Sequence, residues 1–225
     1  DIYEQFKEHT IIPKKRFLEN IRYALWLEQQ VEFPKGGVVE CGVWRGGMTA
    51  GFLKVFGESR SYLLFDSFEG LPPPNENDGE DALWWASHPN HPRYFDNCKA
   101  PSFHVRELLS KEASSGFNVS IVEGWFSDTL PRTSIRPIAF LHLVSDWYDS
   151  TYQCLCRLWK HVLPGGAIII DDYFDWEGCR RAVHDFLSQI KAREAIERVG
   201  TSGGACIRRL GAWDISESPH LECHQ

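Results

Sequence analysis

Residues 38–47, which read VVECGVWRGG, constrain the fold most, because they predict a buried strand that leads through a glycine turn into a helix. The next apolar run, residues 61–65, is again followed by an acid, Asp66. An open α/β sheet holds a ribose-bearing cofactor in this way, with a glycine turn after one strand and a carboxylate after the next. The two segments therefore predict a Rossmann-like domain with a cofactor site at the carboxyl ends of its strands.

The rest of the chain alternates between strand-like and helix-like segments, which predicts a doubly wound, mainly parallel seven-stranded sheet with helices on both faces. We expect helices at residues 13–31, 47–55, 106–115, 148–162 and 177–190. We expect strands at residues 38–41, 62–65, 119–122, 138–143 and 167–170, and two short strands within 195–209. This divides the chain into an N-terminal helical segment (1–35), one α/β domain (36–212) and a tail (213–225).

A long segment rich in proline, residues 69–103, interrupts this alternation. Loops of this length inside a domain are typically substrate lids or binding loops. A disordered surface insertion is the alternative. Trp84 and Trp85 argue against full disorder, because disordered segments are poor in aromatic residues. We therefore expect a lid here.

Composition excludes several classes of function. The net charge of -7 argues against extensive electrostatic binding of nucleic acid. No apolar run approaches the roughly 20 residues of a membrane-spanning helix, and the first residues show no signal-peptide pattern. The seven cysteines form no C-x-x-C pair, which indicates reduced thiols and a cytoplasmic location. His220, Cys223 and His224 in the tail could bind a metal ion, but a frayed terminus is the simpler interpretation.

The spacing of the glycines indicates the kind of cofactor. The pattern E-x-G-x-x-x-G-G from Glu40 to Gly47 differs from the G-x-G-x-x-G of nicotinamide enzymes, which admits a pyrophosphate. A dinucleotide dehydrogenase is therefore disfavoured, and S-adenosylmethionine is the cofactor that we expect. Asp66 would accept hydrogen bonds from the ribose hydroxyls; its alternative role is to cap a helix.

Six segments together resemble one family. They read VVECGVWRGG, LFDSFEGLPPP, EGWFSDTLP, LHLVSDWYDST, PGGAIIIDDY and GCRRAVHDF, and they resemble the macrocin O-methyltransferase (TylF) family in the same order, over residues 36–186. The resemblance implies the class I methyltransferase fold and an S-adenosylmethionine-dependent O-methyltransferase (EC 2.1.1). It further implies that the acceptor is a hydroxyl of a small natural product, typically on a sugar of a glycoside.

The same resemblance assigns binding roles to individual residues. The residues implied to hold the methionine part of the cofactor are Glu40, Gly42, Val43, Trp44, Arg45 and Gly46. Those implied to hold the ribose and the adenine edge are Asp66, Ser67 and Phe68. Those implied to border the adenine are Gly124, Trp125 and Phe126.

The resemblance also implies a general base, Asp146, and a Mg²⁺ site at Asp171 and Asp172. The chain departs from the family pattern at Val144, where a third metal-binding aspartate is expected. Valine has no oxygen to offer, and Mg²⁺ demands near-octahedral oxygen ligands. The metal assignment is therefore the part of the resemblance that this sequence supports least.

Three explanations remain open for this departure. The first is a reduced metal site formed by the remaining acids. The second is a metal-free enzyme in which Asp146, or a lid histidine (His88 or His91), is the base. The third is loss of activity. His142, inside the expected strand 138–143, is interpreted as a core residue rather than a catalyst.

Three further expectations concern the ligand and the assembly. Trp84, Trp85, Trp125 and Trp147 fall in or beside the expected site, where aromatic faces suit sugar rings and flat aglycones. The alternatives to a sugar hydroxyl are a phenol or another non-sugar hydroxyl, or a protein that binds the cofactor without catalysis. A homo-oligomer is compatible with the sequence, which provides no direct signal for it.

Overall fold

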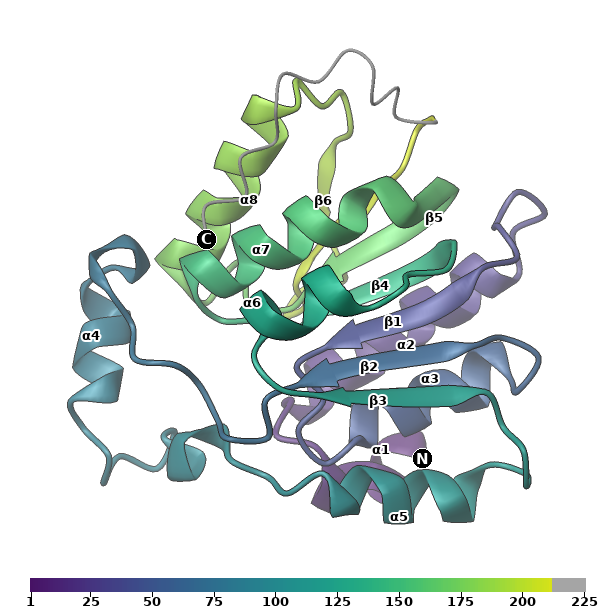
Figure 1. The fold of residues 1–225 in the computed structure, drawn as a ribbon, viewed down its shortest axis with the longest axis horizontal. Coiled ribbons are helices and arrows are strands. Elements are labelled where there is room, and N and C mark those ends of the chain that lie inside the picture. Colours follow the sequence, from purple (N-terminus) through teal and green to yellow (C-terminus); the bar gives the residue numbers. More distant parts are fainter. Residues whose placement is uncertain (212–225) are drawn as a thin grey trace.

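Seven strands form one sheet in the order β3-β2-β1-β4-β5-β7-β6 in the computed structural model, which describes residues 1–211 (Figure 1). Strands β1 to β5 pair in parallel, and β7 runs antiparallel to both β5 and β6. The strands are β1 (Gly37–Cys41), β2 (Tyr62–Asp66), β3 (Val119–Glu123), β4 (Ile138–Leu143), β5 (Val162–Ile170), β6 (Ile196–Arg198) and β7 (Ala205–Arg208). The expected mainly parallel, seven-stranded sheet is thereby confirmed.

Helices cover both faces of this sheet (Figure 1). The α-helices are α1 (Ile2–Phe6), α2 (Lys14–Glu28), α3 (Gly47–Phe56), α4 (Glu80–Ala86), α5 (Phe103–Glu112), α6 (Phe126–Thr129), α7 (Tyr148–Leu158) and α8 (Glu177–Gln189). The short 3₁₀ helices are η1 (Lys7–His9), η2 (Glu76–Asp78), η3 (Phe95–Cys98), η4 (Leu130–Arg132) and η5 (Trp159–His161). Helices α1, α2, α3 and α5 pack together on one face, and α6, α7 and α8 pack on the other.

The central strands are apolar on both sides, as a sheet covered on both faces requires. Successive side chains of a strand point to opposite faces. Val38 accordingly joins the core beneath α2 and α3, whereas its neighbour Val39 joins the core beneath α7 and α8. In β5, Ile169 and Ile170 divide in the same way.

Two expected boundaries around β5 were wrong. The helix expected to reach residue 162 ends at Leu158, and Val162 already pairs with Ile138 of β4. The strand expected at residues 167–170 begins already at Val162, because Gly165 and Gly166 exchange backbone hydrogen bonds with Arg209. Glycines that pair with a neighbouring strand cannot be distinguished from turn glycines by composition alone.

The segment 69–103 contains the helix α4, which the sequence did not predict, and it is packed against the domain. Asp78, only 2% exposed, accepts hydrogen bonds from the backbone N–H groups of Asn75 (2.8 Å) and Tyr148 (2.7 Å). The Nε1 of Trp147 donates to the carbonyl of Pro72 at 2.8 Å. These bonds hold the first half of the segment against the start of α7.

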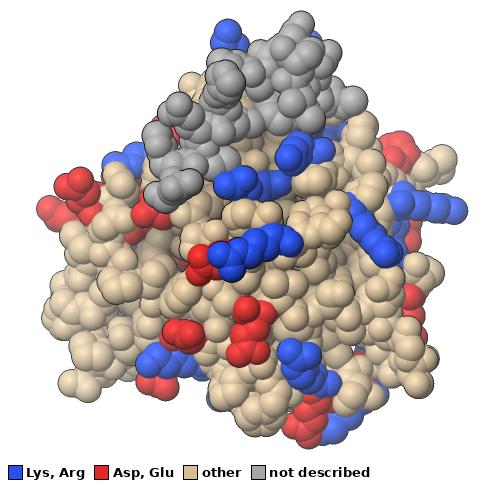
Figure 2. All heavy atoms as spheres, viewed as in Figure 1, with Lys and Arg blue, Asp and Glu red and all other residues tan. Residues whose placement is uncertain are grey.

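The surface and the ends of the chain add little to the assignment of function. On the face drawn in Figure 2, positive and negative side chains are interspersed. No helix within residues 1–211 is long and apolar enough to cross a membrane.

The cysteines of the described residues are free thiols, as expected: Cys41, Cys98, Cys154, Cys156, Cys179 and Cys206. The tail candidates His220, Cys223 and His224 lie outside the described residues.

Candidate active site

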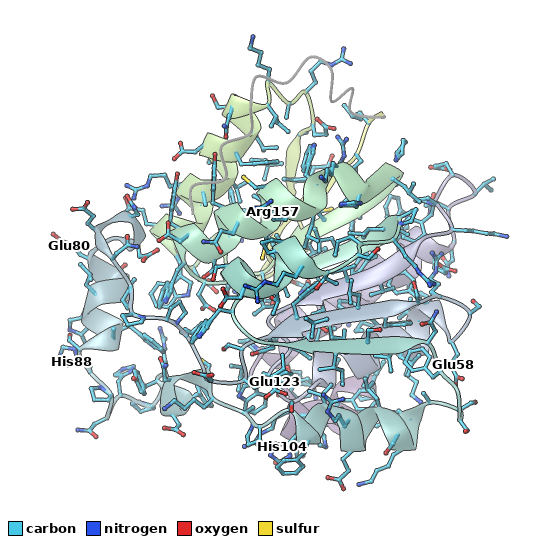
Figure 3. The ribbon with its side chains drawn as sticks, in the orientation of Figure 1. Glu58, Glu80, His88, His104, Glu123 and Arg157 are labelled. Atoms are coloured by element: carbon cyan, nitrogen blue, oxygen red, sulfur yellow. The ribbon has the colours of Figure 1, made fainter. Side chains whose placement is uncertain are left out.

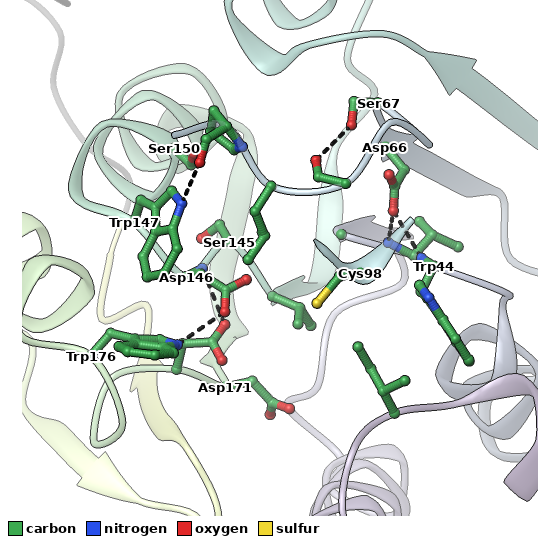
Figure 4. Close-up of a pocket in the computed structure, with 18 of the residues that line it drawn as sticks. Trp44, Asp66, Ser67, Cys98, Ser145, Asp146, Trp147, Ser150, Asp171 and Trp176 are labelled. Atoms are coloured by element: carbon green, nitrogen blue, oxygen red, sulfur yellow. Dashed lines mark hydrogen bonds between the residues drawn. The ribbon is translucent and has the colours of Figure 1, made fainter. Parts of the chain in front are cut away.

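A cavity of about 480 Å³ opens where β1, β2, β4 and β5 end (Figure 4). Its walls come from the segment before α2, the glycine turn after β1, the lid segment, the start of α6 and the loops after β4 and β5. The volume lies in the range usual for small-molecule and cofactor sites. Ligands of open α/β sheets bind at this edge, where the strand order reverses between β1 and β4.

Most residues assigned by resemblance do lie together here. Those that line the cavity are Glu40, Gly42, Val43, Trp44, Asp66, Ser67, Trp125, Phe126, Val144, Asp146, Asp171 and Asp172. Arg45, Gly46, Phe68 and Gly124 do not line it. The Arg45 guanidinium lies over the ring of Trp44, 4.4 Å from the ring centre, and Phe68 packs into the core. Gly46 starts α3 with a left-handed φ of 85°, so its role is to shape the turn.

Asp66 holds the glycine turn in place. Its Oδ2 accepts hydrogen bonds from the backbone N–H groups of Val43 (2.6 Å) and Trp44 (2.8 Å), and its Oδ1 accepts one from Phe68 (2.7 Å). A carboxylate offers about four acceptor sites. Three are used here, so one remains for a ligand. Burial raises the pKa of Asp66, while the three backbone N–H groups oppose that rise.

Glu40, His142 and Asp171 form a buried charged row across β1, β4 and β5. The Nδ1 of His142 lies 3.0 Å from Glu40 Oε1, and its Nε2 lies 3.3 Å from Asp171 Oδ1. Thr49 donates a hydrogen bond to the other oxygen of Glu40. Burial alone would lower the pKa of His142, but the two carboxylates raise it to about 10, so the imidazole is positively charged. His142 is thus a buried residue, as expected, and one that orders the site.

Asp146 stands at the end of β4 with a strained backbone. Its φ is 49°, in the left-handed region that few residues other than glycine, asparagine and aspartate adopt. The Nε1 of Trp176 donates to its Oδ1 at 3.0 Å, and its own backbone N–H lies 3.3 Å from Asp172 Oδ2 (Figure 4). Burial raises the pKa of Asp146 to about 7, and the Trp176 hydrogen bond lowers it in part. Strained backbone in such a cavity is typical of functional residues.

The residues present do not fit a Mg²⁺ ion well. Val144 places a hydrocarbon side chain in the wall where a third carboxylate is expected. Asp171 Oδ1 already faces His142 and accepts a hydrogen bond from Asn20 at 2.8 Å. Within residues 1–211, no group of three or more histidine, cysteine or acidic side chains is arranged to hold a metal ion. The expected metal site therefore finds no support in this geometry.

The lid contributes aromatic walls but no histidine. Trp85 and Trp147 line the cavity and meet edge to face, with ring centres 5.7 Å apart. Trp84, expected beside the site, is 50% exposed and stacks on His88 instead. His88, labelled in Figure 3, and His91 do not line the cavity. Neither histidine is therefore placed to act as a base in this arrangement.

Several cavity residues were not predicted from the sequence, and Arg16 and Trp176 are two of them. Arg16 reaches the cavity from α2, and its Nη1 lies 2.6 Å from Asp175 Oδ2. Trp176 follows the acid pair after β5 and turns back to Asp146. Trp176 could have been suspected from its place four residues after Asp172. No local signal marks Arg16, because its contacts are far away in the sequence.

Comparison with known proteins identifies the family. The sequence profile of the macrocin O-methyltransferase (TylF) family matches residues 6–208. The chain belongs to this family. It is accordingly an O-methyltransferase, and the resemblance drawn from its six motifs is confirmed.

Curated relatives have about 30% identity with this TylF-family chain. The 8-demethyl-8-(2,3-dimethoxy-alpha-L-rhamnosyl)-tetracenomycin-C 4'-O-methyltransferase of Streptomyces olivaceus is 31% identical over 199 residues, covering 87% of this chain and 74% of that protein. The demethyldecarbamoylnovobiocin O-methyltransferase of Streptomyces niveus is also 31% identical, over 201 residues, with the same coverage. The mycinamicin III 3''-O-methyltransferase of Micromonospora griseorubida is 30% identical over 206 residues, covering 87% of this chain and 76% of that protein.

Solved structures agree with this assignment. The O-methyltransferase NovP has a TM-score of 0.74 at 30% identity, covering 90% of this chain and 82% of its own. The calicheamicin methyltransferase CalS11 has a TM-score of 0.65 at 19% identity, covering 92% of this chain and 91% of its own. At that identity the second likeness concerns the fold alone, which is that of class I methyltransferases.

Proposed function

We propose that this enzyme transfers the methyl group of S-adenosylmethionine to a hydroxyl on a sugar of a small glycosylated natural product, with Asp146 as the general base. One observation carries the proposal. A single cavity joins the glycine turn and Asp66, on the cofactor side, to Asp146 at the end of β4. A methyl donor and a base on two walls of one cavity are what an O-methyl transfer requires.

The cofactor wall supports S-adenosylmethionine, which a methyltransferase family implies as the donor. Asp66 keeps one acceptor site free, enough for one ribose hydroxyl while the glycine turn stays closed. Trp125 and Phe126, at the start of α6, offer apolar surface for the adenine. Glu40 lines the cavity and is only 1% exposed, and it would face the methionine ammonium.

The acceptor wall supports an in-line displacement. The hydroxyl oxygen must approach the methyl carbon opposite the sulfur, and a base must take the hydroxyl proton as the new bond forms. The Oδ1 of Asp146 accepts the hydrogen bond from Trp176, so Oδ2 would accept the hydroxyl proton. The same hydrogen bond fixes the orientation of the carboxylate and of its free lone pairs. Trp85 and Trp147 line the cavity, and Trp147 packs edge to face on Trp176, with ring centres 5.0 Å apart, so these rings would shield the bound acceptor from water.

The names of the relatives favour a sugar acceptor. The tetracenomycin enzyme is named for a rhamnosyl compound that it methylates at a 4' oxygen, and the mycinamicin enzyme for a 3'' oxygen. Aromatic walls such as those of Trp85 and Trp147 suit both a sugar ring and a flat aglycone. We propose that the segment 69–103 is the lid that closes over this acceptor.

The experiment that tests the proposal measures methyl transfer from labelled S-adenosylmethionine. The acceptors are a set of deoxysugar glycosides, each paired with its own aglycone as a control. Label in the glycosides but not in the aglycones would support a sugar hydroxyl. Label in the aglycones alone would refute the sugar assignment. Cofactor binding by calorimetry without any transfer would favour the non-catalytic alternative.

A further inference from the structure

We propose that Arg16 is the resident cation at the acidic end of the cavity, and that methyl transfer here proceeds without a divalent metal ion. The inference rests on the proposed function, because it concerns how the same site handles the hydroxyl. It assigns a positioning role to a residue of the N-terminal helix α2, which lies outside all six motifs.

The first observation is the state of the oxygen atoms that would have to bind a metal. Asp171 Oδ1 already faces His142 at 3.3 Å and Asn20 at 2.8 Å. Asp172 Oδ2 lies 3.3 Å from a backbone N–H, and Val144 offers no oxygen. Mg²⁺ requires about six oxygen ligands in near-octahedral geometry. Asp171 Oδ2 is buried without a hydrogen-bond partner, but within residues 1–211 no group of three or more histidine, cysteine or acidic side chains is arranged to hold a metal ion, and Val144 stands where a third acid is expected.

The second observation is where Arg16 lies. Its side chain is 14% exposed and lines the same cavity as both acids of the pair after β5. Nη1 lies 2.6 Å from Asp175 Oδ2, and Nε donates to the carbonyl of Ser202 at 3.1 Å. Burial by itself lowers the pKa of Arg16, but Asp175, Asp171 and Asp172 raise it. The guanidinium is therefore a fixed charge, held on two sides.

The third observation is the charge balance. His142, fully buried, already lies between Glu40 and Asp171, 3.0 Å and 3.3 Å from their carboxylate oxygens. The Arg16 guanidinium lines the same cavity as Asp171 and Asp172 and is paired with Asp175. A divalent ion bound beside these acids would be repelled by this guanidinium, because like charges repel strongly in a poorly solvated site. The acids at this end of the cavity therefore already have a side-chain cation beside them.

In this arrangement Asp146 accepts the proton of the acceptor hydroxyl. In the transfer, the sulfonium–methyl bond breaks, its electron pair stays on sulfur, and S-adenosylhomocysteine forms. The acceptor oxygen forms the new bond to the methyl carbon, and its proton passes to the carboxylate of Asp146. Arg16 does not touch the acceptor in this scheme. Its charge opposes the rise in pKa that burial causes at Asp146 and Asp172, and its ion pair holds Asp175 in place.

Calorimetric titration with Mg²⁺ alone tests the proposal independently of activity. We expect no saturable binding to the wild-type protein. Val144→Asp restores a third carboxylate, and Val144→Asn is its uncharged control of nearly equal size. We expect Mg²⁺ to bind at least about tenfold more tightly to the Asp variant than to the Asn variant. Tight, saturable Mg²⁺ binding to the wild type would overturn the proposal.

Methyl transfer after removal of metals with a chelator is the second test. We expect an unchanged wild-type rate, and a loss restored by Mg²⁺ would overturn the proposal. Arg16→Gln should lower kcat about 10- to 100-fold with little change in KM, and Arg16→Lys should recover much of it. Arg22→Gln, on the exposed side of the same helix, is the matched control.

One readout separates a charge role from a merely structural one. If the guanidinium replaces a metal electrostatically, added Mg²⁺ should raise the rate of methyl transfer by Arg16→Gln. It should not raise the rate of the wild type. Equal loss in Arg16→Gln and Arg16→Lys, with lowered melting temperatures and no response to Mg²⁺, would refute the role. If no acceptor is methylated at all, the proposed function fails, whereas the Mg²⁺ titrations still decide the metal question.

Discussion

The substitution Asp146→Asn tests the assignment of the base with little structural disturbance. Asparagine has nearly the same shape, and it is one of the few residues that tolerate the left-handed φ of 49° found here. Its amide oxygen can still accept the hydrogen bond from Trp176. The variant therefore removes the charge and the basicity while it keeps the backbone and the tryptophan in place.

The size of the effect follows from the chemistry of proton transfer. A positioned general base accelerates such steps by about 10²- to 10⁴-fold. At about 1.36 kcal/mol per factor of ten, the barrier should rise by about 2.7–5.4 kcal/mol. Cofactor affinity should change by less than about threefold, because Asp66 and the glycine turn are untouched, and such a factor corresponds to under about 1 kcal/mol.

Single-turnover methyl transfer at saturating cofactor measures this barrier directly, because it separates chemistry from product release. Calorimetric titration of S-adenosylmethionine and thermal unfolding serve as controls for binding and folding. A rate within about threefold of the wild type, where a base should contribute at least about 10², would refute the assignment. The oxygen would then have to lose its proton to another group.

Three further substitutions probe the residues around this centre. Asp66→Asn should weaken cofactor binding about tenfold or more in calorimetry, because the glycine turn loses a charged acceptor of three N–H groups. Unchanged affinity would remove Asp66 from the cofactor site. Glu40→Gln breaks the buried pair with His142 and should destabilise the fold by about 3–5 kcal/mol in denaturant unfolding; a loss below about 1 kcal/mol would show that His142 is neutral. Glu19 accepts hydrogen bonds from Thr201 and Ser202, which lower its pKa to about 2. Its stabilisation should be present above pH 4.5 and lost as the pH falls towards 2, and Glu19→Gln should abolish that part of the acid dependence of unfolding.

The sequence predicted the sheet because its signals are local. Each central strand is an apolar run of about five residues, and the glycine turn at residues 42–47 fixes where the first helix begins. Gly42 shows why that signal is strong: its φ is 85°, and a side chain there would collide with the backbone of Val144. The start of the turn is therefore determined by packing that only glycine allows.

The rest of the site could not be predicted, because it depends on contacts between distant parts of the chain. Arg16 meets Asp175 across more than 150 residues, and no periodicity marks such a pair. Trp84 and Trp85 are adjacent tryptophans, but Trp84 is exposed and Trp85 lines the cavity. Which of the two faces inward depends on how α4 packs.

In a site without a metal, the acidity of the acceptor hydroxyl determines how much a general base accelerates methyl transfer. A phenol has a pKa near 10, close to that of tyrosine, so a fraction of it ionises in mildly alkaline buffer. An alkyl hydroxyl of a sugar is far less acidic and depends on Asp146 throughout. Asp146→Asn should therefore cost less with a phenolic acceptor than with a glycoside, and the difference should grow with pH. Equal losses with both acceptors across the pH range would indicate that Asp146 orients the acceptor rather than taking its proton.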